Sequence, residues 1–83
     1  MNQAIQFPDR EEWDSDRHAV CFPAQVNGIN LTCAISGVTL QQRYGSDMSE
    51  IELFRAHRWD LEEQAEQLIA QQQEDDQGWL WIS

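Results

Sequence analysis

Residues 18–36 read HAVCFPAQVNGINLTCAIS, two runs of alternating polarity joined by Asn27-Gly28. Asn-Gly is the favoured pair for a type I′ turn, because both central residues of that turn take positive φ. A two-residue turn also fixes the residues that face each other across a hairpin. The pairs are all apolar or nearly so and share one face, which we assign to the core: Val26 with Ile29, Ala24 with Leu31, Phe22 with Cys33, and Val20 with Ile35.

The other face of the predicted hairpin carries small and weakly polar side chains, among them Cys21, Thr32 and Ala34. Cys21 and Cys33 point to opposite faces in this register, so they cannot form an intramolecular disulfide unless the hairpin slips by one residue. We expect Cys33 to behave as a buried hydrophobe. Cys21 has no histidine or arginine placed by sequence to lower its pKa. Pro23 lacks an amide hydrogen, which predicts a free or bulged edge of the first strand there.

Helical signals follow the hairpin. Capping-box spacing within residues 38–45 predicts a short helix that ends at Gly45. Ser49 and Glu52 form a second capping box near the start of residues 46–73, which read as one long helix. Its apolar stripe has helical period and consists of Ile51, Phe54, Leu61, Ala65, Leu68 and Ile69.

Arg58 falls near the centre of this stripe, and the sequence leaves two explanations open. In the first, the helix breaks near residues 57–60, Asp60 caps the new segment, and Arg58 keeps its charged head in water. In the second, the helix is continuous and Arg58 pairs with a buried carboxylate or binds an anion.

The last residues, 79–82, read WLWI and follow three acids, a glutamine and a glycine. Acids at a helix C-terminus oppose its dipole, so residues 74–78 predict a stop and a turn. A final strand would place Trp79 and Trp81 on one face, with the two aliphatic residues on the other.

The predicted fold class is α+β. We expect one domain over residues 1–83, in which a small antiparallel sheet of three to four strands packs against one long and one short helix. The N-terminal β-hairpin and the C-terminal strand form the sheet. A short strand before Pro8, then a turn or one helical turn that brings Trp13 against the sheet, complete the N-terminus.

The charge balance limits the classes of partner. Five basic residues, all of them arginine, stand against fifteen acidic ones, for a formal net charge of −10. Such a chain repels polyanions, so we expect neither nucleic-acid nor membrane binding. The N-terminus lacks the features of a secretion signal, and no apolar run approaches the roughly 20 residues of a membrane span. We therefore expect a cytoplasmic protein.

No catalytic constellation, metal site or cofactor motif is apparent in the sequence. We expect a non-enzymatic protein-interaction domain with an unknown protein partner. Its candidate binding residues are Trp79, Trp81, Cys21 and Thr32, because flat aromatic side chains beside small ones make a suitable groove. The competing explanation is that Trp13 and the N-terminal segment cover this face.

A second function is a small anionic-ligand or enzymatic role that uses an anion site made of Arg43, Arg55, His57 and Arg58. A homodimer formed through a free sheet edge is a third alternative.

Four segments together resemble the YrdB-type family of small bacterial proteins, a domain family of unknown function. They are MNQAIQFPDREEWD (1–14), VCFPAQVNGINLTCAISG (20–37), FRAHRWDLEEQAEQLI (54–69) and EDDQGWLWIS (74–83). The resemblance runs essentially from end to end and implies a compact, cytoplasmic α+β domain of a gammaproteobacterial kind. It implies no activity and no catalytic or binding residue.

Overall fold

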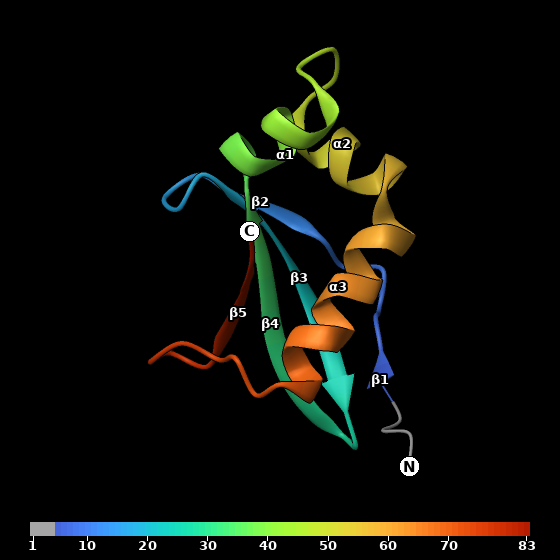
Figure 1. Cartoon of the computed structure of the whole chain (residues 1–83), viewed down its shortest axis with the longest axis vertical. Helices are drawn as coiled ribbons and strands as arrows, with labels where there is room; N and C mark the ends of the chain where they lie inside the picture. The colour runs from blue at the N-terminus through green and yellow to red at the C-terminus, as the bar shows by residue number, and fades with distance from the viewer. Residues whose placement is uncertain (1–4) are drawn as a thin grey trace.

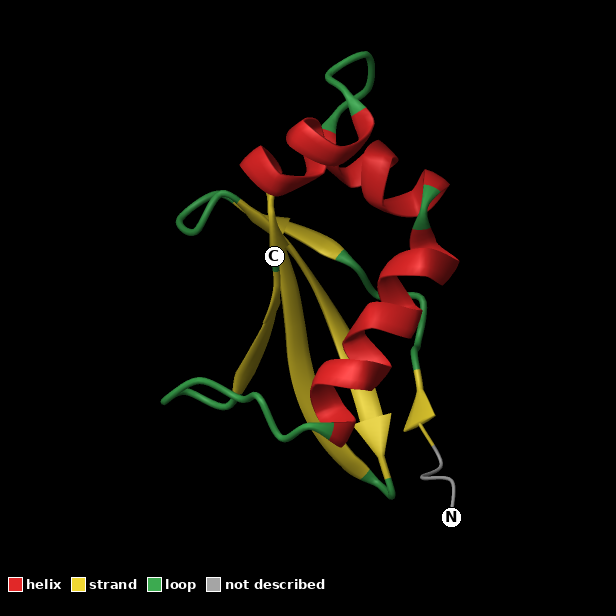
Figure 2. Cartoon of the chain, viewed as in Figure 1, coloured by secondary structure: helices red, strands yellow, loops and turns green. Residues whose placement is uncertain are grey.

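A computed structural model describes residues 5–83, and its sheet and helices confirm the α+β class (Figure 1). In chain order the elements are β1 (Ile5–Gln6), β2 (Glu12–Asp14), β3 (Ala19–Val26), β4 (Ile29–Ser36), α1 (Gly37–Tyr44), α2 (Glu50–Ala56), α3 (Arg58–Ala70) and β5 (Trp79–Ile82). Figure 2 shows the three helices following one another between β4 and β5. Within residues 5–83, no helix is long and apolar enough to cross a bilayer.

The β3–β4 hairpin has the register that its turn predicts. Asn27 and Gly28 take φ of 53° and 85°, as a type I′ turn requires. All four predicted apolar pairs are confirmed, from Val26 opposite Ile29 to Val20 opposite Ile35. The hairpin is therefore specified locally, by its turn and by its own alternation.

The core lies between the helices and one face of the sheet. From the sheet it takes Val20, Phe22, Ala24, Cys33, Ile35, Leu80 and Ile82. From the helices it takes Leu40, Leu53, Phe54, Leu61, Ala65 and Ile69. Phe22 and Phe54 meet across this layer with ring centroids 4.8 Å apart. Burial of these side chains is the main favourable term in folding.

The N-terminal segment extends the sheet. β1 and β2 both pair antiparallel with the outer edge of β3, where Ile5 lies opposite Val26 and Trp13 opposite Val20. Between them the chain leaves the edge at Pro23, which has no amide hydrogen to offer a partner. The short strand before Pro8 is confirmed, whereas the turn expected to bring Trp13 to the sheet is wrong in part, because that residue lies in a strand.

The sheet is mixed, which corrects the expectation of a purely antiparallel one. β5 pairs parallel with β4, with Thr32 opposite Trp79 and Ala34 opposite Trp81. The connection between β4 and β5 explains the parallel pairing, because its three helices carry the chain back to the starting end of β4 before β5 begins (Figure 1). Including β1 and β2, the sheet has five strands.

The expected long helix is two helices, which corrects the count of one long and one short. α2 ends and α3 begins at His57, whose φ of −120° and ψ of 26° leave the helical region. The break is one of the two explanations left open for Arg58, but Asp60 is not its cap and lies in the first turn of α3. The short helix α1 begins earlier than predicted, because Ser36 caps it by accepting a hydrogen bond from the Thr39 amide.

Candidate functional site

One face of the sheet carries no helix, and we call it the open face. In β3, β4 and β5 the register places ten residues on it: Ala19, Cys21, Pro23, Gln25, Asn30, Thr32, Ala34, Ser36, Trp79 and Trp81. The first eight are small or weakly polar, as the sequence predicts. The two tryptophans stand beside them on β5, so the four candidate binding residues Trp79, Trp81, Cys21 and Thr32 share this face.

The two tryptophans form a stacked pair. Their ring centroids are 5.9 Å apart and the ring planes meet at 27°. Trp79 is half-buried, and Trp81 keeps 36% of its surface exposed. Beside Trp81, Ala34 is fully buried, so the small side chain forms a floor that the aromatic pair borders.

Asp75 holds this pair in place from the turn before β5. One carboxylate oxygen accepts hydrogen bonds from the Gln77 and Trp79 amides, both at 2.9 Å. The other accepts from the Trp81 indole Nε1 at 3.1 Å. These bonds, the Trp79 amide first, lower the pKa of Asp75. The acidic turn therefore orients the tryptophan pair, whereas the helix has already ended at Ala70.

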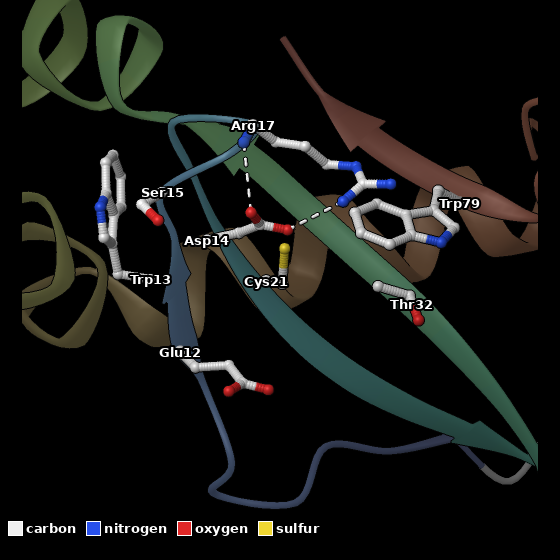
Figure 3. A pocket seen from close by; sticks show the side chains of 8 residues that line it. All are labelled: Glu12, Trp13, Asp14, Ser15, Arg17, Cys21, Thr32 and Trp79. Atoms are coloured by element: carbon white, nitrogen blue, oxygen red, sulfur yellow. Dashed lines mark hydrogen bonds and ion pairs between the residues drawn. The ribbon is translucent and has the colours of Figure 1, made fainter.

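A hollow of about 470 Å³ opens on this face at the β2–β3 end. Its lining comes from β2, the turn after it, β3, β4 and β5: Glu12, Trp13, Asp14, Ser15, Arg17, Cys21, Thr32 and Trp79 (Figure 3). The volume lies within the range of ligand pockets, roughly 300–1,000 Å³.

Arg17 crosses the top of this hollow from the β2–β3 turn (Figure 3). Its guanidinium carbon lies 4.4 Å from the centre of the Trp79 ring, in a cation–π contact. Its Nη1 donates to the Asp14 carboxylate at 3.0 Å. The other Asp14 oxygen accepts from the Asp16 and Arg17 amides, so the turn shapes its own ion pair.

The thiol in the hollow is not activated. Burial, and then the negative charge of Asp14, raise the pKa of Cys21. Burial alone raises the pKa of Cys33 to about 12 on the core face. Both cysteines are free. Within residues 5–83, no group of three or more histidine, cysteine, aspartate or glutamate residues could hold a metal ion.

Negative charge dominates the rim of the hollow. Asp14 is neutralised by Arg17, but Glu12 has no cationic partner among the residues that the structure describes. Asp16 lies in the adjoining turn, and Asp75 lies close enough for Arg17 to lower its pKa further. Glu12 and Asp14 line the hollow with Arg17, Asp16 and Asp75 lie nearby, and Arg10 borders an adjoining hollow with Glu12. The balance of four acids to two arginines favours cations over anions.

The structure brings together three of the four residues of the alternative anion site. Arg55, His57 and Arg58 border a second hollow of about 380 Å³ at the helix break. Arg43 lies elsewhere and donates to Gln64 and to the Ser83 carbonyl. His57 stacks on Tyr44, with ring centroids 3.7 Å apart. Three of the four proposed residues therefore share a hollow, and Arg43 lies apart from them.

Glu11 occupies the two arginines nearest the break. It accepts from Arg55 Nε at 2.7 Å and from Arg58, while only 8% of its side chain is exposed. Burial by itself would raise the pKa of Glu11, but the hydrogen bonds from Arg58 and Arg55 lower it to about 2. The structure thus combines the two explanations of Arg58, since the helix breaks and the arginine also pairs with a buried carboxylate.

Trp13 does not cover the open face. It lies opposite Val20, whose side chain belongs to the core, so Trp13 projects to the helix side of the sheet and only borders the hollow. Asp14 and Arg17 are not among the predicted site residues, because the predicted turn ends at Trp13 and residues 14–17 are not assigned to an element. The usable signal was local, since Asp14 begins a polar turn directly before the first hairpin strand.

Comparisons with known proteins confirm the family resemblance over nearly the whole chain. Residues 5–82 match the family described as "Protein of unknown function (DUF1488)". The chain is 64% identical over 84 residues to "Uncharacterized protein YrdB" of Escherichia coli (strain K12), covering 99% of both proteins. It is 63% identical to the protein of the same description from Shigella flexneri, again with 99% of both covered.

A solved structure agrees with the fold. The crystal structure of a protein of unknown function from the DUF1488 family of Shewanella loihica PV-4 superimposes with a TM-score of 0.90 at 36% identity. The alignment covers 99% of this chain and 94% of that one. The chain therefore belongs to the DUF1488 family, together with the YrdB proteins.

Proposed function

We propose that this chain acts in the cytoplasm as a non-enzymatic protein-interaction domain, and that it binds its partner through the open face. The observation that carries the proposal is the placement of Trp79 and Trp81, which stack on a sheet face that no helix covers. Tryptophan is among the residues that most often dominate binding energy at interfaces. A floor of small side chains lets a partner approach the rings closely.

Trp59, an exposed tryptophan on the helical side, provides a useful comparison. Trp59 is 86% exposed at the start of α3, more than either tryptophan of the open face. It stands singly, however, among the polar and charged side chains of Arg55, His57, Arg58 and Asp60. Trp59 also borders a hollow, the second one, but isolated apolar side chains are common on protein surfaces, whereas a paired aromatic patch is typical of a binding site.

The anion-site function has less support than protein binding through the open face. Arg55 and Arg58 both pair with Glu11, so a bound anion would have to compete with a nearly buried carboxylate. Arg58 also lies within ion-pair distance of Asp9 and Glu62, at 3.4 and 3.6 Å. Their positive charge is already compensated within the chain.

Affinity capture from the cytoplasm of a bacterium that carries the protein tests the proposal. Trp81→Ala, and separately Trp79→Ala, should lose the captured partner, because each removes one ring of the pair. Trp59→Ala is the matched control, since it removes an exposed tryptophan from the helical side, and it should retain the partner. Circular dichroism and thermal unfolding establish that each variant is folded. Loss of the partner by Trp59→Ala, with retention by Trp81→Ala, would overturn the proposal.

A further inference from the structure

We propose that the hollow binds an arginine side chain of the protein partner, and that Arg17 occupies the place of this arginine in the free protein. This inference rests on the proposed function, because it assumes that the open face meets a partner. It adds the chemistry of the recognised group and assigns Arg17 the role of an internal competitor.

Arg17 itself demonstrates that a guanidinium fits. Its head lies 4.4 Å from the centre of the Trp79 ring and donates to Asp14 at 3.0 Å. An aromatic face with an adjacent carboxylate is the usual environment for an arginine at an interface. Guanidinium is planar and weakly hydrated, so it stacks on an indole better than the compact ammonium of lysine does.

The contact of Arg17 is also replaceable. The Arg17 side chain is 42% exposed, and its only ion pair within residues 5–83 is the one with Asp14. Exposed ion pairs and exposed cation–π contacts are weak. Asp14, by contrast, is held by two backbone amides of its own turn, so its carboxylate stays in place when Arg17 leaves. The acceptor is preorganised, while its internal occupant is held only by weak, exposed contacts.

The charges around the hollow favour a cationic occupant. Glu12 lines the hollow without a cationic partner among residues 5–83, and it provides a second carboxylate for an incoming guanidinium. Asp16 and Asp75 add negative charge nearby, and the whole chain carries a formal −10. This field attracts a basic segment and repels an acidic one.

Titration of the full-length protein with a defined peptide tests the inference. The probe is the blocked tripeptide acetyl-Gly-Arg-Gly-amide, and the readout is the indole NH signals of Trp79, Trp81 and Trp59 in ¹H–¹⁵N NMR spectra. We expect the indole NH signal of Trp79 to shift until the peptide saturates the protein, while the signal of Trp59 does not move. Arg17→Ala should bind the peptide about fivefold more tightly than the wild type, because the internal competitor is gone.

Two controls separate specific recognition from general charge attraction. Arg43→Ala lowers the net charge by the same amount as Arg17→Ala but removes an arginine of α1 that does not line the hollow and donates to Gln64 and Ser83, so its affinity should equal that of the wild type. The same peptide with citrulline in place of arginine keeps the shape without the charge, and it should not bind. Glu12→Gln, on the exposed rim, should weaken binding without risk to the core.

Equal or weaker binding by Arg17→Ala would overturn the inference, and so would equal binding of the citrulline peptide. If the arginine peptide does not bind but Trp81→Ala still loses the captured partner, this inference fails and the proposed function stands. If Trp79→Ala and Trp81→Ala both retain that partner, the proposed function fails.

Discussion

Asp75 is the single residue that most directly organises the open face. Its carboxylate accepts three hydrogen bonds, from the amides of Gln77 and Trp79 and from the indole of Trp81. The main chain reinforces this arrangement, since the Asp75 amide donates to the Trp79 carbonyl at 2.8 Å. A turn that would otherwise only reverse the chain thus fixes the geometry of the tryptophan pair.

Asp75→Ala should therefore lower the melting temperature by about 4 °C, because two amides and one indole lose their acceptor. The Trp81 indole NH signal should move toward its position in a free side chain. Asp76→Ala is the matched control, because it removes the neighbouring acid, for which no hydrogen bond is seen within residues 5–83. Equal melting temperatures for the two variants would show that Asp75 does not orient the pair.

Glu11 ties the N-terminal segment to the helix break, and its pKa predicts a pH dependence. The folded-state pKa is about 2, below the ordinary value of 4.5. The ion pairs of Glu11 therefore stabilise the protein fully above pH 4.5, and this stabilisation is lost as the pH falls toward 2.

Glu11→Gln should lower the free energy of unfolding at pH 7 by about 1–2 kcal/mol, a value reduced for solvent screening of the exposed partner Arg55. Urea denaturation from pH 7 down to pH 2 checks the prediction, and the difference from the wild type should shrink below pH 4.5. Glu12→Gln, at the adjacent position, should have little effect at any pH. A difference that stays constant down to pH 2 would contradict the assigned pairing.

At the scale of elements, the register of the β3–β4 hairpin separates the two thiols. Cys33 points into the core and Cys21 into the hollow, and the pKa of each is raised. We expect a thiol reagent to modify Cys21 slowly at pH 8 and to modify Cys33 only on unfolding. Cys21→Ser should abolish the native-state reaction, while Cys33→Ser should leave it unchanged. Formation of an intramolecular disulfide in the folded protein would contradict the register.

The hairpin could be predicted in full from the sequence because its turn and its pairs are local. The same holds for the capping box of Ser49 and Glu52, which the structure confirms. β2 was missed because its three residues form a strand only beside β3, a pairing that no pattern within them reveals. The parallel direction of β5 depends on the path of three helices, and this too is a property of the whole fold.

The candidate site was predictable in part for the same reason. Alternation placed Trp79 and Trp81 on one face of the last strand, and the hairpin register placed Cys21 and Thr32 on one face of the hairpin. Only the pairing of β5 with β4 shows that these are the same face of the sheet. The reach of Arg17 across β3 and β4 to β5 has no sequence signature at all. Nor does the pairing of Glu11 with Arg55 and Arg58, which lie on either side of the break at His57.

At the scale of the whole molecule, the sheet offers little edge for a second copy. The outer strands β1, β2 and β5 have two, three and four residues. Both backbone groups of Trp79 are bonded to Asp75, so β5 is partly closed as an edge. Because the chain also carries a formal charge of −10, we expect a monomer in sedimentation equilibrium at physiological salt. A dimer that persists on dilution would favour the edge-paired alternative.

The molecule as a whole has two unlike sides. Helices and the network around Glu11 close one side, whereas the other presents paired tryptophans, small residues and an acidic hollow. The binding surface is therefore expected on the open face, whatever the identity of the partner.

Site-specific photocrosslinking in living cells tests that claim most directly. A benzoylphenylalanine placed at Asn30, an exposed residue of the open face, is compared with one placed at Trp59 on the helical side. The account predicts a discrete crosslinked protein from position 30 that is absent from position 59 and is lost when Trp81→Ala is added. A partner captured from position 59 and not from position 30 would contradict it.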